Sequence, residues 1–528
     1  MGIKENRSQP LKGRALLNSV IERSSYLDNY LSKVISHSYI NRMLICNPVI
    51  SRNPFSSSLL LKSGNQGFYG ARRQSTTKKV IVNLLKYYFK NVVFFFFFLM
   101  HFIAFKMSKL KCDKKKIDQD KPLIVIDTFT MIDKIYPKAR FKDAYFGSLY
   151  KVMNKRNRQY LVLCCLFGDR IWHLSRRVQT YNILAEDGRN FITEFELMGV
   201  DEWIDLVKFI LIYPFKVLKL KRQVFGEFDE LFREEIIDTL HSVQFGNYVR
   251  YLSGRKMKKL TGGKLIVISW YENQVIDKLF FRGIRESGVE SKIYGCQFYP
   301  KPALLRNLYP LTEEGKYGVI PDVIFVSGKY YLDDKNGLDI RLGVSPRYNY
   351  LFDVKLDEET IKKREGLLIL LTYSITESRR IIGVVQEAIE AGLSEQVTIK
   401  FHPNHCHMKP FSYPDAWKYS EEDLAELCPN ASIVVTSGSS AALEAAVMGC
   451  SVIIVGNDVG LTFVPMTGYG KGKIWDLAFD AREVKQSIRR LSGYRKDHAN
   501  EIKEIAAELR DMIFTQATEE KYIELFEL

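Results

Sequence analysis

Residues 396–456 decide the fold: QVTIKFHPNHCHMKPFSYPD opens this stretch and ASIVVTSGSSAALEAAVMGCSVIIVG closes it. Two short apolar runs rich in β-branched residues, 397–401 and 431–435, each end in a polar cluster. A third run, 451–455, follows a helix-forming segment that Gly449 closes. Strand, hydroxyl-rich turn, helix and strand form a βαβ unit. The stretch therefore predicts a parallel α/β sheet with a ligand site at the carboxyl ends of its strands.

The turn after the second run reads Thr436-Ser437-Gly438-Ser439-Ser440. Backbone N–H groups at a helix start, the positive end of the helix dipole and several hydroxyls together favour an anion. We therefore expect these residues to bind a phosphate, most simply that of a nucleotide. The alternative for Ser439 and Ser440 is a helix cap, because serine hydroxyls satisfy unpaired N–H groups at a helix start.

The first run ends in His402-Pro403, on a strand expected to neighbour the serine-rich turn. We expect His402 to point at the same phosphate and Lys400 to add positive charge. His405, Cys406 and His407 follow closely and suggest zinc, but a structural zinc site needs a second pair of ligands elsewhere. The remaining histidines are scattered, so we expect no metal.

The chain length of 528 residues favours two or three domains, and 46% hydrophobic residues suffice for large cores. Strands alternate with helices over residues 121–353, which predicts a first Rossmann-like domain. A charged linker opens residues 354–528, where the pattern restarts as a second Rossmann-like domain with a helical tail. We predict an α/β fold of two doubly wound domains that face each other across a cleft.

The basic charge is concentrated in one part of the chain. Residues 1–120 contain 21 Lys and Arg against 6 Asp and Glu, or +15 of the total +16. The remainder is nearly neutral, which argues against a nucleic-acid partner and for an anionic membrane surface. The eight cysteines form no paired framework, which indicates a reducing, cytoplasmic setting.

Residues 1–120 are expected to form a disordered basic extension, with a weak helical pattern only at 16–35. Within it, residues 80–105 (VIVNLLKYYFKNVVFFFFFLMHFIAF) are strongly apolar. We interpret them as an interfacial anchor or a marginal transmembrane helix that keeps the body in the cytoplasm. Two alternatives stay open: the segment packs as a core helix, or translation starts at Met107. Basic residues flank it at 72, 73, 78 and 79 and at 106, 109, 111 and 114–116.

Residues 206–222 (LVKFILIYPFKVLKLKR) alternate apolar and basic residues around Pro214. This pattern is typical of an amphipathic element on an anionic membrane. A helix hairpin packed on the first domain, with its lysines in water, is equally compatible.

The main candidate for catalysis is Glu272, in SWYENQ, because it directly follows an apolar strand. A half-buried carboxylate at a strand end suits a general base. The alternative is an acid in the first turn of a helix, where the helix dipole favours it. Gln297 ends the next strand and is a candidate substrate contact.

FHPN followed by TSGSSAALEAAVMGCSVI resembles the C-terminal half of GT-B glycosyltransferases that build bacterial capsule and lipopolysaccharide. It is similar to polysialyltransferases, Kdo transferases and CDP-glycerol glycerophosphotransferases. This resemblance spans about residues 121–480. It implies donor-phosphate contacts at His402, Ser437, Ser439 and Ser440, a ribose- or sugar-binding acid at Glu444, and a base at Glu272. It also implies that residues 121–353 bind the acceptor and carry catalysis, and that residues 354–528 bind the nucleotide-sugar. Two features depart from the family pattern. Gln297 is followed by Phe298, where relatives often have His, and FHPN replaces a more basic run.

The resemblance implies an inverting, metal-independent transferase that moves a sugar from a nucleotide-activated donor to a surface polysaccharide or lipid-linked acceptor. The nucleotide-sugar is a substrate, and no cofactor is expected. Two alternatives remain: a sugar-nucleotide 2-epimerase, which needs further carboxylates in the cleft, and a membrane-tethered scaffold without turnover. The sequence leaves open the donor nucleotide, sugar, acceptor, linkage and oligomeric state.

Overall fold

The computed structural model describes residues 10–528 apart from residues 42, 66–75, 114–116, 137–139, 169–172, 243, 333–336, 394 and 406–410. The basic residues at 72, 73 and 114–116, and Cys406 and His407, lie outside the described residues.

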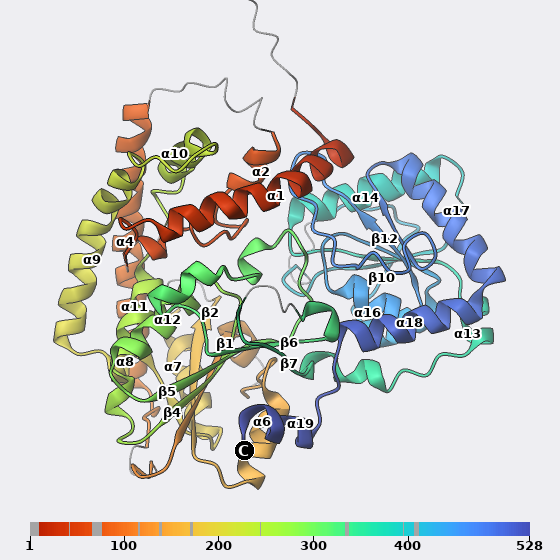
Figure 1. The fold of residues 1–528 in the computed structure, drawn as a ribbon. Helices are drawn as coiled ribbons and strands as arrows, with labels where there is room; N and C mark the ends of the chain where they lie inside the picture. Colours follow the sequence, from red (N-terminus) through yellow and green to blue (C-terminus); the bar gives the residue numbers. More distant parts are fainter. Residues whose placement is uncertain are drawn as a thin grey trace, which may run out of the picture.

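Two parallel sheets, one in each half of the chain, organise the molecule (Figure 1). Their strands are short apolar runs buried on both faces, as parallel strands covered by helices are. The prediction of an α/β fold with two doubly wound, Rossmann-like domains is confirmed.

The first sheet has the order β3-β2-β1-β4-β5-β6-β7. The chain steps outward from β1 to β3 and then returns to β4 on the other side of β1. This reversal makes the β1/β4 boundary the switch point of the sheet, where open α/β sheets place their ligands. The strands are β1 (Leu123–Met131), β2 (Tyr160–Phe167), β3 (Phe191–Ile192), β4 (Leu265–Trp270), β5 (Ser291–Gln297), β6 (Val323–Val326) and β7 (Ile340–Leu342). The helices between them are α5 (Ile132–Ile135), α6 (Gly147–Lys155), α7 (Leu174–Glu186), α8 (Glu194–Leu197), α9 (Val200–Leu220), α10 (Asp229–Asp238), α11 (Phe245–Arg255) and α12 (Val275–Glu286).

The second sheet repeats this plan in the order β10-β9-β8-β11-β12-β13, with its switch point between β8 and β11. A 3-10 helix, η9 (Pro346–Phe352), and α13 (Glu358–Lys363) join the two halves. The strands are β8 (Leu367–Leu370), β9 (Val397–Lys400), β10 (Lys418–Tyr419), β11 (Ile433–Thr436), β12 (Ser451–Val455) and β13 (Trp475–Ala478). The helices are α14 (Ile375–Glu390), α15 (Leu424–Leu427), α16 (Ala441–Val447), α17 (Ala481–Asp497) and α18 (Ala499–Ile513).

The C-terminal tail crosses back to the first half, which differs from the expected boundary of 354–528. Helix α19 (Glu519–Phe526) packs on α6, where the Tyr522 and Ser148 hydroxyls lie 2.7 Å apart. Lys292 on β5 pairs with Glu527 at 2.8 Å. The tail therefore belongs to the second domain only as far as α18. The return of α19 to the first half depends on contacts between distant residues, which no local sequence pattern encodes.

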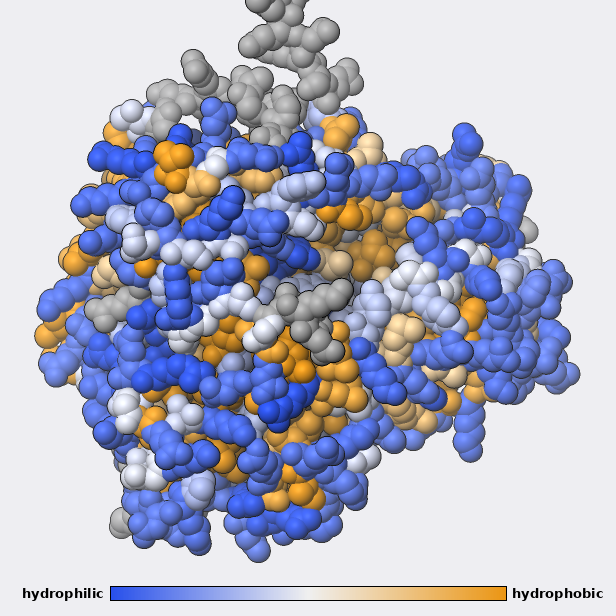
Figure 2. Space-filling model, viewed as in Figure 1, coloured by the Kyte–Doolittle hydropathy of each residue, from blue (hydrophilic) through white to orange (hydrophobic). Residues whose placement is uncertain are grey.

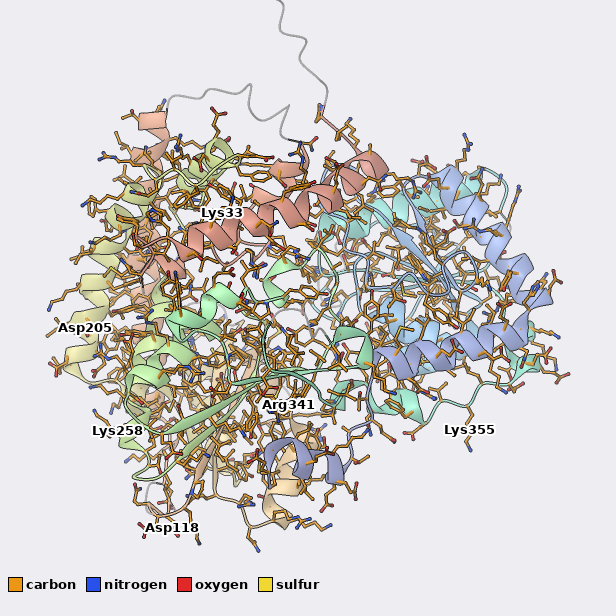
Figure 3. All side chains as sticks on the ribbon, in the orientation of Figure 1. Lys33, Asp118, Asp205, Lys258, Arg341 and Lys355 are labelled. Atoms are coloured by element: carbon orange, nitrogen blue, oxygen red, sulfur yellow. The ribbon has the colours of Figure 1, made fainter. Side chains whose placement is uncertain are left out.

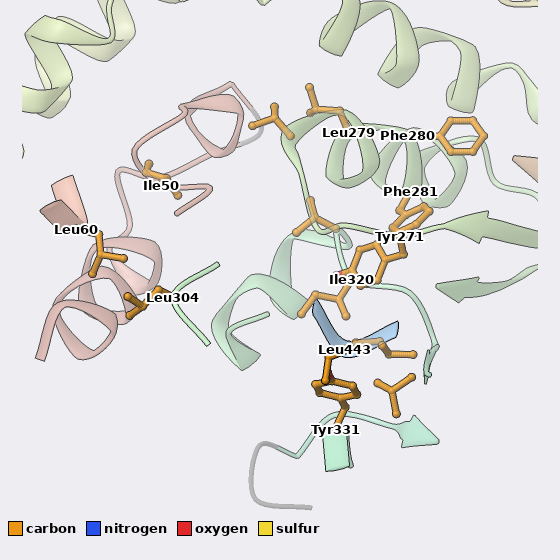
Figure 4. Close-up of a cluster of buried hydrophobic side chains, with 14 of the residues drawn as sticks. Ile50, Leu60, Tyr271, Leu279, Phe280, Phe281, Leu304, Ile320, Tyr331 and Leu443 are labelled. Carbon is orange, nitrogen blue, oxygen red and sulfur yellow. The ribbon is translucent and has the colours of Figure 1, made fainter. Parts of the chain in front are cut away.

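The expectation of a disordered extension is wrong for most of the described N-terminal residues. Helix α1 (Gly13–Ser36), the 3-10 helix η1 (Leu44–Cys46) and α2 (Leu59–Gly64) precede the first sheet. Ile50 is 0% exposed, and Figure 4 shows Ile50 and Leu60 in the same apolar cluster as Phe280 and Phe281 of α12. The many Ser and Asn residues that suggested disorder instead make turns: Asn47 Oδ1, for example, accepts a hydrogen bond from Val49 N at 2.9 Å.

Helix α1 also ties the two halves together, because it runs across both (Figure 1). At its start, Gly13 N donates to Asp458 O at 2.8 Å and Arg14 pairs with Glu483 at 2.9 Å, both in the second half. Farther along, the Tyr30 hydroxyl donates to Asp229 Oδ1 at 2.9 Å in the first half.

Helix α4 (Thr76–Met107) contains the apolar segment, and residues 77–107 are long and apolar enough to cross a membrane by length and composition. One side of the helix is attached to the body by polar side chains. Asn83 donates to Ile237 O at 2.7 Å, Tyr87 donates to Ile210 O at 3.2 Å, and His101 Nδ1 lies 3.2 Å from the Tyr181 hydroxyl. Helices α7, α9, α10 and α11 pack along this side of the segment.

Candidate functional site

A cavity of about 310 Å³ lies at the carboxyl ends of β1, β2 and β4, at the switch point of the first sheet. Its wall is mostly aromatic and apolar, with two carboxylates and an amide. This composition suits a site that orients a partly apolar substrate through a few polar groups. The lining residues are Phe129, Tyr145, Cys165, Phe167, Trp270, Glu272, Gln274, Ile276 and Asp277.

Glu272 lies in this cavity, as its position after a strand predicted. Strand β4 ends at Trp270, and Asn273 then adopts a left-handed backbone with φ of 51°, which is uncommon for a residue other than glycine. The turn presents Glu272 into the cavity before α12 begins. Trp270 Nε1 donates to Glu272 Oε1 at 3.0 Å, and Gln274 Nε2 donates to Oε2 at 2.5 Å. Glu272 is thus outside the helix, and the first-turn acid of α12 is Asp277.

Asp277 is the residue that sequence reasoning missed. Its Oδ2 accepts the backbone N–H groups of Glu272 at 3.1 Å and Gln274 at 3.0 Å, so it fixes the conformation of the turn between β4 and α12. Burial, together with the negative charge of Glu272, raises the pKa of Asp277 from 3.8 to about 7. The sequence signal was a Gln274-x-x-Asp277 capping box, which marks a helix start and does not indicate a cavity.

A buried ion pair lies at the switch point between β1 and β4. One nitrogen of the Arg250 guanidinium lies 2.7 Å from each oxygen of Asp127, and the Ser269 hydroxyl donates to Asp127 Oδ2 at 2.8 Å. These contacts connect α11 to β1 and β4 directly below the switch point. Removing one member would leave a buried charge unpaired.

Gln297 does not line the cavity. Its side chain is 0% exposed, donates to Leu308 O at 2.8 Å, and accepts from Lys301 Nζ at 2.9 Å. In this arrangement it supports the loop after β5 and does not face a substrate.

The serine turn, residues 436–440, lies at the switch point of the second sheet. The Thr436 hydroxyl donates to Leu370 O at 2.9 Å and joins β11 to β8, so it is occupied by the sheet. Gly438 packs against backbone: a Cβ there would lie 2.9 Å from the carbonyl oxygen of Phe463. Ser439 Oγ accepts from Ala441 N at 3.3 Å, which is the capping role left open by the sequence.

Ser440 directly precedes α16 and makes no side-chain cap. It instead hydrogen-bonds with Tyr348 of η9. Helix α16 has only seven residues, so its dipole contributes less to an anion site than the sequence suggested. Ser437 is buried, and its carbonyl accepts from Ser439 N at 2.7 Å.

Glu444 is buried on the side of α16 that faces the linker. The Tyr350 hydroxyl of η9 donates to its Oε2 at 2.6 Å. Burial raises the pKa of Glu444, although that hydrogen bond and the charge of Arg347 oppose the increase. The acid that the resemblance assigned to a ribose or sugar therefore contacts the segment that joins the two halves.

His402 follows β9 and is half-buried. Its Nδ1 accepts from Asn404 N at 3.2 Å, and its ring centroid lies 6.4 Å from that of Tyr373, in the loop after β8. Lys400 lies one position earlier, but Lys400 Nζ donates to the carbonyls of Glu421 and Glu422 at 3.1 and 2.6 Å. The lysine is thus engaged at the sheet edge.

Arg347 lies on η9, the segment that joins the two halves, and the sequence pattern did not single it out. Burial and the negative charge of Glu272 raise the pKa of Tyr145 in the cavity wall, and burial raises the pKa of Glu444 on α16; the positive charge of Arg347 opposes both increases. The Arg347 side chain is exposed, its guanidinium carbon lies 5.8 Å from the centre of the Tyr348 ring, and within the described residues it forms no hydrogen bond or ion pair. An exposed arginine whose charge acts on groups of both sites is a candidate to bind a phosphate.

A larger cavity, of about 540 Å³, lies at the opposite, amino ends of β8, β9 and β11. It is lined by Arg364, Ser432 and Arg495 among others. Because ligands of doubly wound sheets bind at the carboxyl ends, we place the functional site at the cavity of Glu272.

No protein-family model matches this chain, and no curated protein sequence matches it. Among solved structures it is similar to a UDP-GlcNAc 2-epimerase from Neisseria meningitidis bound to UDP-GlcNAc, with 11% identity, 77% of this chain and 99% of that chain covered, and a TM-score of 0.42. It is also similar to the glycotransferase of kitacinnamycin, with 10% identity, 77% and 100% covered, and a TM-score of 0.41. The spinosyn rhamnosyltransferase SpnG complexed with thymidine diphosphate has 10% identity, 77% and 100% covered, and a TM-score of 0.40. At this level of similarity the matches carry no argument about activity.

Proposed function

We propose that this protein is a glycosyltransferase of GT-B type that moves a sugar from a nucleotide-activated donor to a surface glycan or a lipid-linked acceptor. The observation that carries the proposal is the pairing of two switch-point sites. The carboxylate cavity lies at the switch point of the first sheet, and the serine turn lies at the switch point of the second, next to η9, which joins the two halves. Sugar transfer requires a carboxylate base and a phosphate-binding turn.

In the proposed reaction Glu272 removes the proton of an acceptor hydroxyl. That oxygen attacks the anomeric carbon of the donor from the side opposite the nucleotide, and the bond from carbon to phosphate oxygen breaks. The configuration at the carbon inverts. Side chains of the protein stabilise the negative charge of the leaving phosphate, without a metal: the hydroxyls of Ser437, Ser439 and Ser440, the His402 ring and the Arg347 guanidinium.

The rival proposal, a sugar-nucleotide 2-epimerase, has one observation in its favour. Epimerisation needs a second acid or base near the first, and Asp277 lies beside Glu272 in the same cavity. The two activities separate in an assay without acceptor. An epimerase converts the sugar nucleotide alone, whereas a transferase leaves it intact except for slow hydrolysis.

The binding test is a thermal-shift panel of the full chain with CMP, CDP, UDP and GDP, repeated on His402→Ala. The full chain is needed because residues 10–65 contribute to the core. At 100 times the dissociation constant, a bound nucleotide stabilises by roughly 2.7 kcal/mol. We expect one nucleotide to stabilise the wild type and to have a smaller effect on the variant. A panel without any shift would refute the nucleotide site.

The catalytic test is Glu272→Gln, which keeps the size of the side chain and one of its two accepting oxygens but cannot accept a proton as a carboxylate does. We expect transfer to fall by roughly 10²–10⁴-fold with nucleotide binding unchanged, as for loss of a general base. Full activity in the variant would remove Glu272 from the mechanism. A wild type that binds a nucleotide but turns over no donor would favour the scaffold.

A further inference from the structure

Helices α4 and α9 lie side by side and antiparallel, although about a hundred residues separate them in sequence. The Tyr87 and Tyr88 hydroxyls of α4 donate to the carbonyls of Ile210 and Leu211 of α9 at 3.2 and 3.1 Å. Toward the other end, the ring of Trp203 lies against Phe98 at 5.4 Å between centroids. Figure 1 shows the two helices standing together along the left edge of the molecule.

Both helices turn a stripe of large apolar side chains outward. On α4, Leu85 is 67% and Phe89 is 71% exposed. On α9, Leu211 is 54% and Phe215 is 55% exposed. Figure 2 shows apolar side chains at the left edge, where the helices lie. We call this surface the α4–α9 face. It consists of Ile81, Val82, Leu85, Phe89, Val92, Phe96, Val200, Ile204, Val207, Leu211, Ile212 and Phe215.

Exposed lysines accompany the apolar stripes. Lys208 and Lys219 lie on the exposed side of α9, at helical spacing from Leu211 and Phe215. On α4, exposed lysines occur at 78, 86 and 106. The sequence of α4 contains no Asp or Glu, and the acids of α9 are confined to its amino end at Asp201, Glu202 and Asp205, the last of which Figure 3 labels. The face is therefore apolar and positively charged.

The positive charge of the α4–α9 face distinguishes between two partners that could cover it, a second copy of the chain and an anionic membrane. In a two-fold dimer the face would pack against its own copy and bring its lysines together, which is repulsive. An anionic bilayer accepts the apolar side chains among its acyl chains and the lysines among its headgroups.

The attachment of α4 to the body also defines how it meets the bilayer. Its inward side binds protein at Asn83, Tyr87 and His101, along most of the helix. Burial lowers the pKa of His101 from 6.5 to about 3, so this side chain is neutral inside the protein. A helix covered on one side by its own domain lies in the plane of the interface and does not cross it.

We propose that the α4–α9 face docks the protein in plane on an anionic phospholipid membrane, without a transmembrane span. This proposal rests on the proposed function, because membrane docking serves a transferase whose acceptor is lipid-linked. Docking holds the domain that contains the Glu272 cavity at the surface where a lipid-linked acceptor resides. The interpretations of residues 80–105 and 206–222 as separate membrane elements thus merge into one surface.

The test is flotation of the full chain with vesicles of phosphatidylcholine alone and of phosphatidylcholine mixed with phosphatidylglycerol. We expect the wild type to float with the mixed vesicles, and Phe89→Glu with Leu211→Glu to lower the floated fraction by roughly tenfold or more, since each change places a charge in the apolar stripe. Lys208→Ala with Lys219→Ala should weaken flotation mainly on the anionic vesicles. Val459→Glu is the matched control, because Val459 is equally exposed but lies in the second half, and we expect it to float like the wild type.

Several outcomes would overturn the proposal. One is a wild type that fails to float with the mixed vesicles. Another is a dimer in solution that Leu211→Glu converts to a monomer, which would make the face a protein interface. Bound protein that resists alkaline carbonate extraction would indicate a span. Nucleotide binding by the same variants separates the proposals: intact nucleotide stabilisation without flotation leaves the transferase standing, and flotation without nucleotide binding leaves only the docking surface.

Discussion

Replacing Asp277 by Asn should make the protein more stable, by an amount that grows with pH. Burial and the neighbouring Glu272 raise the pKa of Asp277 from 3.8 to about 7. Between these values the folded protein keeps a proton that the unfolded chain has released, so the wild type loses stability as pH rises. Below this window both states are protonated, and above it both are ionised. Asn cannot ionise, and its amide oxygen can still accept the two backbone N–H groups.

The size of the effect follows from that window. Each pH unit changes the free energy of unfolding by about 1.36 kcal/mol, which gives about 4 kcal/mol over the whole window. For a domain of this size, 1 kcal/mol corresponds to roughly 2 °C of melting temperature. The difference in melting temperature between Asp277→Asn and the wild type should therefore grow by up to about 8 °C across the window. The wild type and Asp277→Asn should therefore melt close together near the acidic end and separate toward about pH 8.

The assay is thermal unfolding followed by circular dichroism in a series of buffers from about pH 4 to about pH 8. The reasoning is refuted if the difference in melting temperature between the two proteins does not change with pH. Glu272→Gln supplies an internal check, because it removes the neighbouring negative charge. In the Glu272→Gln protein, the further change Asp277→Asn should produce a smaller difference in melting temperature, because the pKa of Asp277 is raised less.

Two further predictions concern the linker and the N-terminal region. Arg347→Ala should weaken nucleotide binding by roughly 10–100-fold in a calorimetric titration, because one hydrogen-bonded charge pair with the phosphate is lost. The control is Arg341→Ala, which removes an exposed arginine of β7. Equal nucleotide affinities of the two variants would exclude Arg347 from the phosphate site. Ile50→Ala should cost about 2–5 kcal/mol in stability because it leaves a cavity in the core, whereas Leu11→Ala at an exposed position should change little. Identical denaturant midpoints for these last two would mean that the N-terminal segment does not stabilise the body.

The switch-point sites were predictable because local patterns encode them. Apolar β-branched runs followed by polar turns locate strand ends, and strand ends of parallel sheets face ligands. That reasoning correctly placed Glu272 and the serine turn at the carboxyl ends of β4 and β11. It could not show which side chains the fold itself occupies. Thr436, Gln297 and Lys400 have donors directed at backbone carbonyls, and such partners arise only when distant strands come together.

The N-terminal region shows the opposite case. Its composition resembles that of disordered chains, rich in Ser, Asn and Arg, and only a weak helical pattern marked α1. Its apolar residues are too few and too dispersed to form a core alone, yet many of them, such as Ile50 and Leu60, are buried in a core that they share with the rest of the chain (Figure 4). Burial that is shared between distant segments leaves no periodic signal in either one.

The sequence by itself determined the fold class, the two sheets, the position of Glu272 and the serine turn, and the presence of apolar, basic segments, since these follow from local periodicity and charge. Only the tertiary structure decided that Asp277 lies in the cavity of Glu272, that the tail returns to the first domain, and that α4 and α9 lie side by side. These features depend on contacts between residues far apart along the chain. Their energies come from burial and charge in the assembled protein, and no single stretch of sequence carries them.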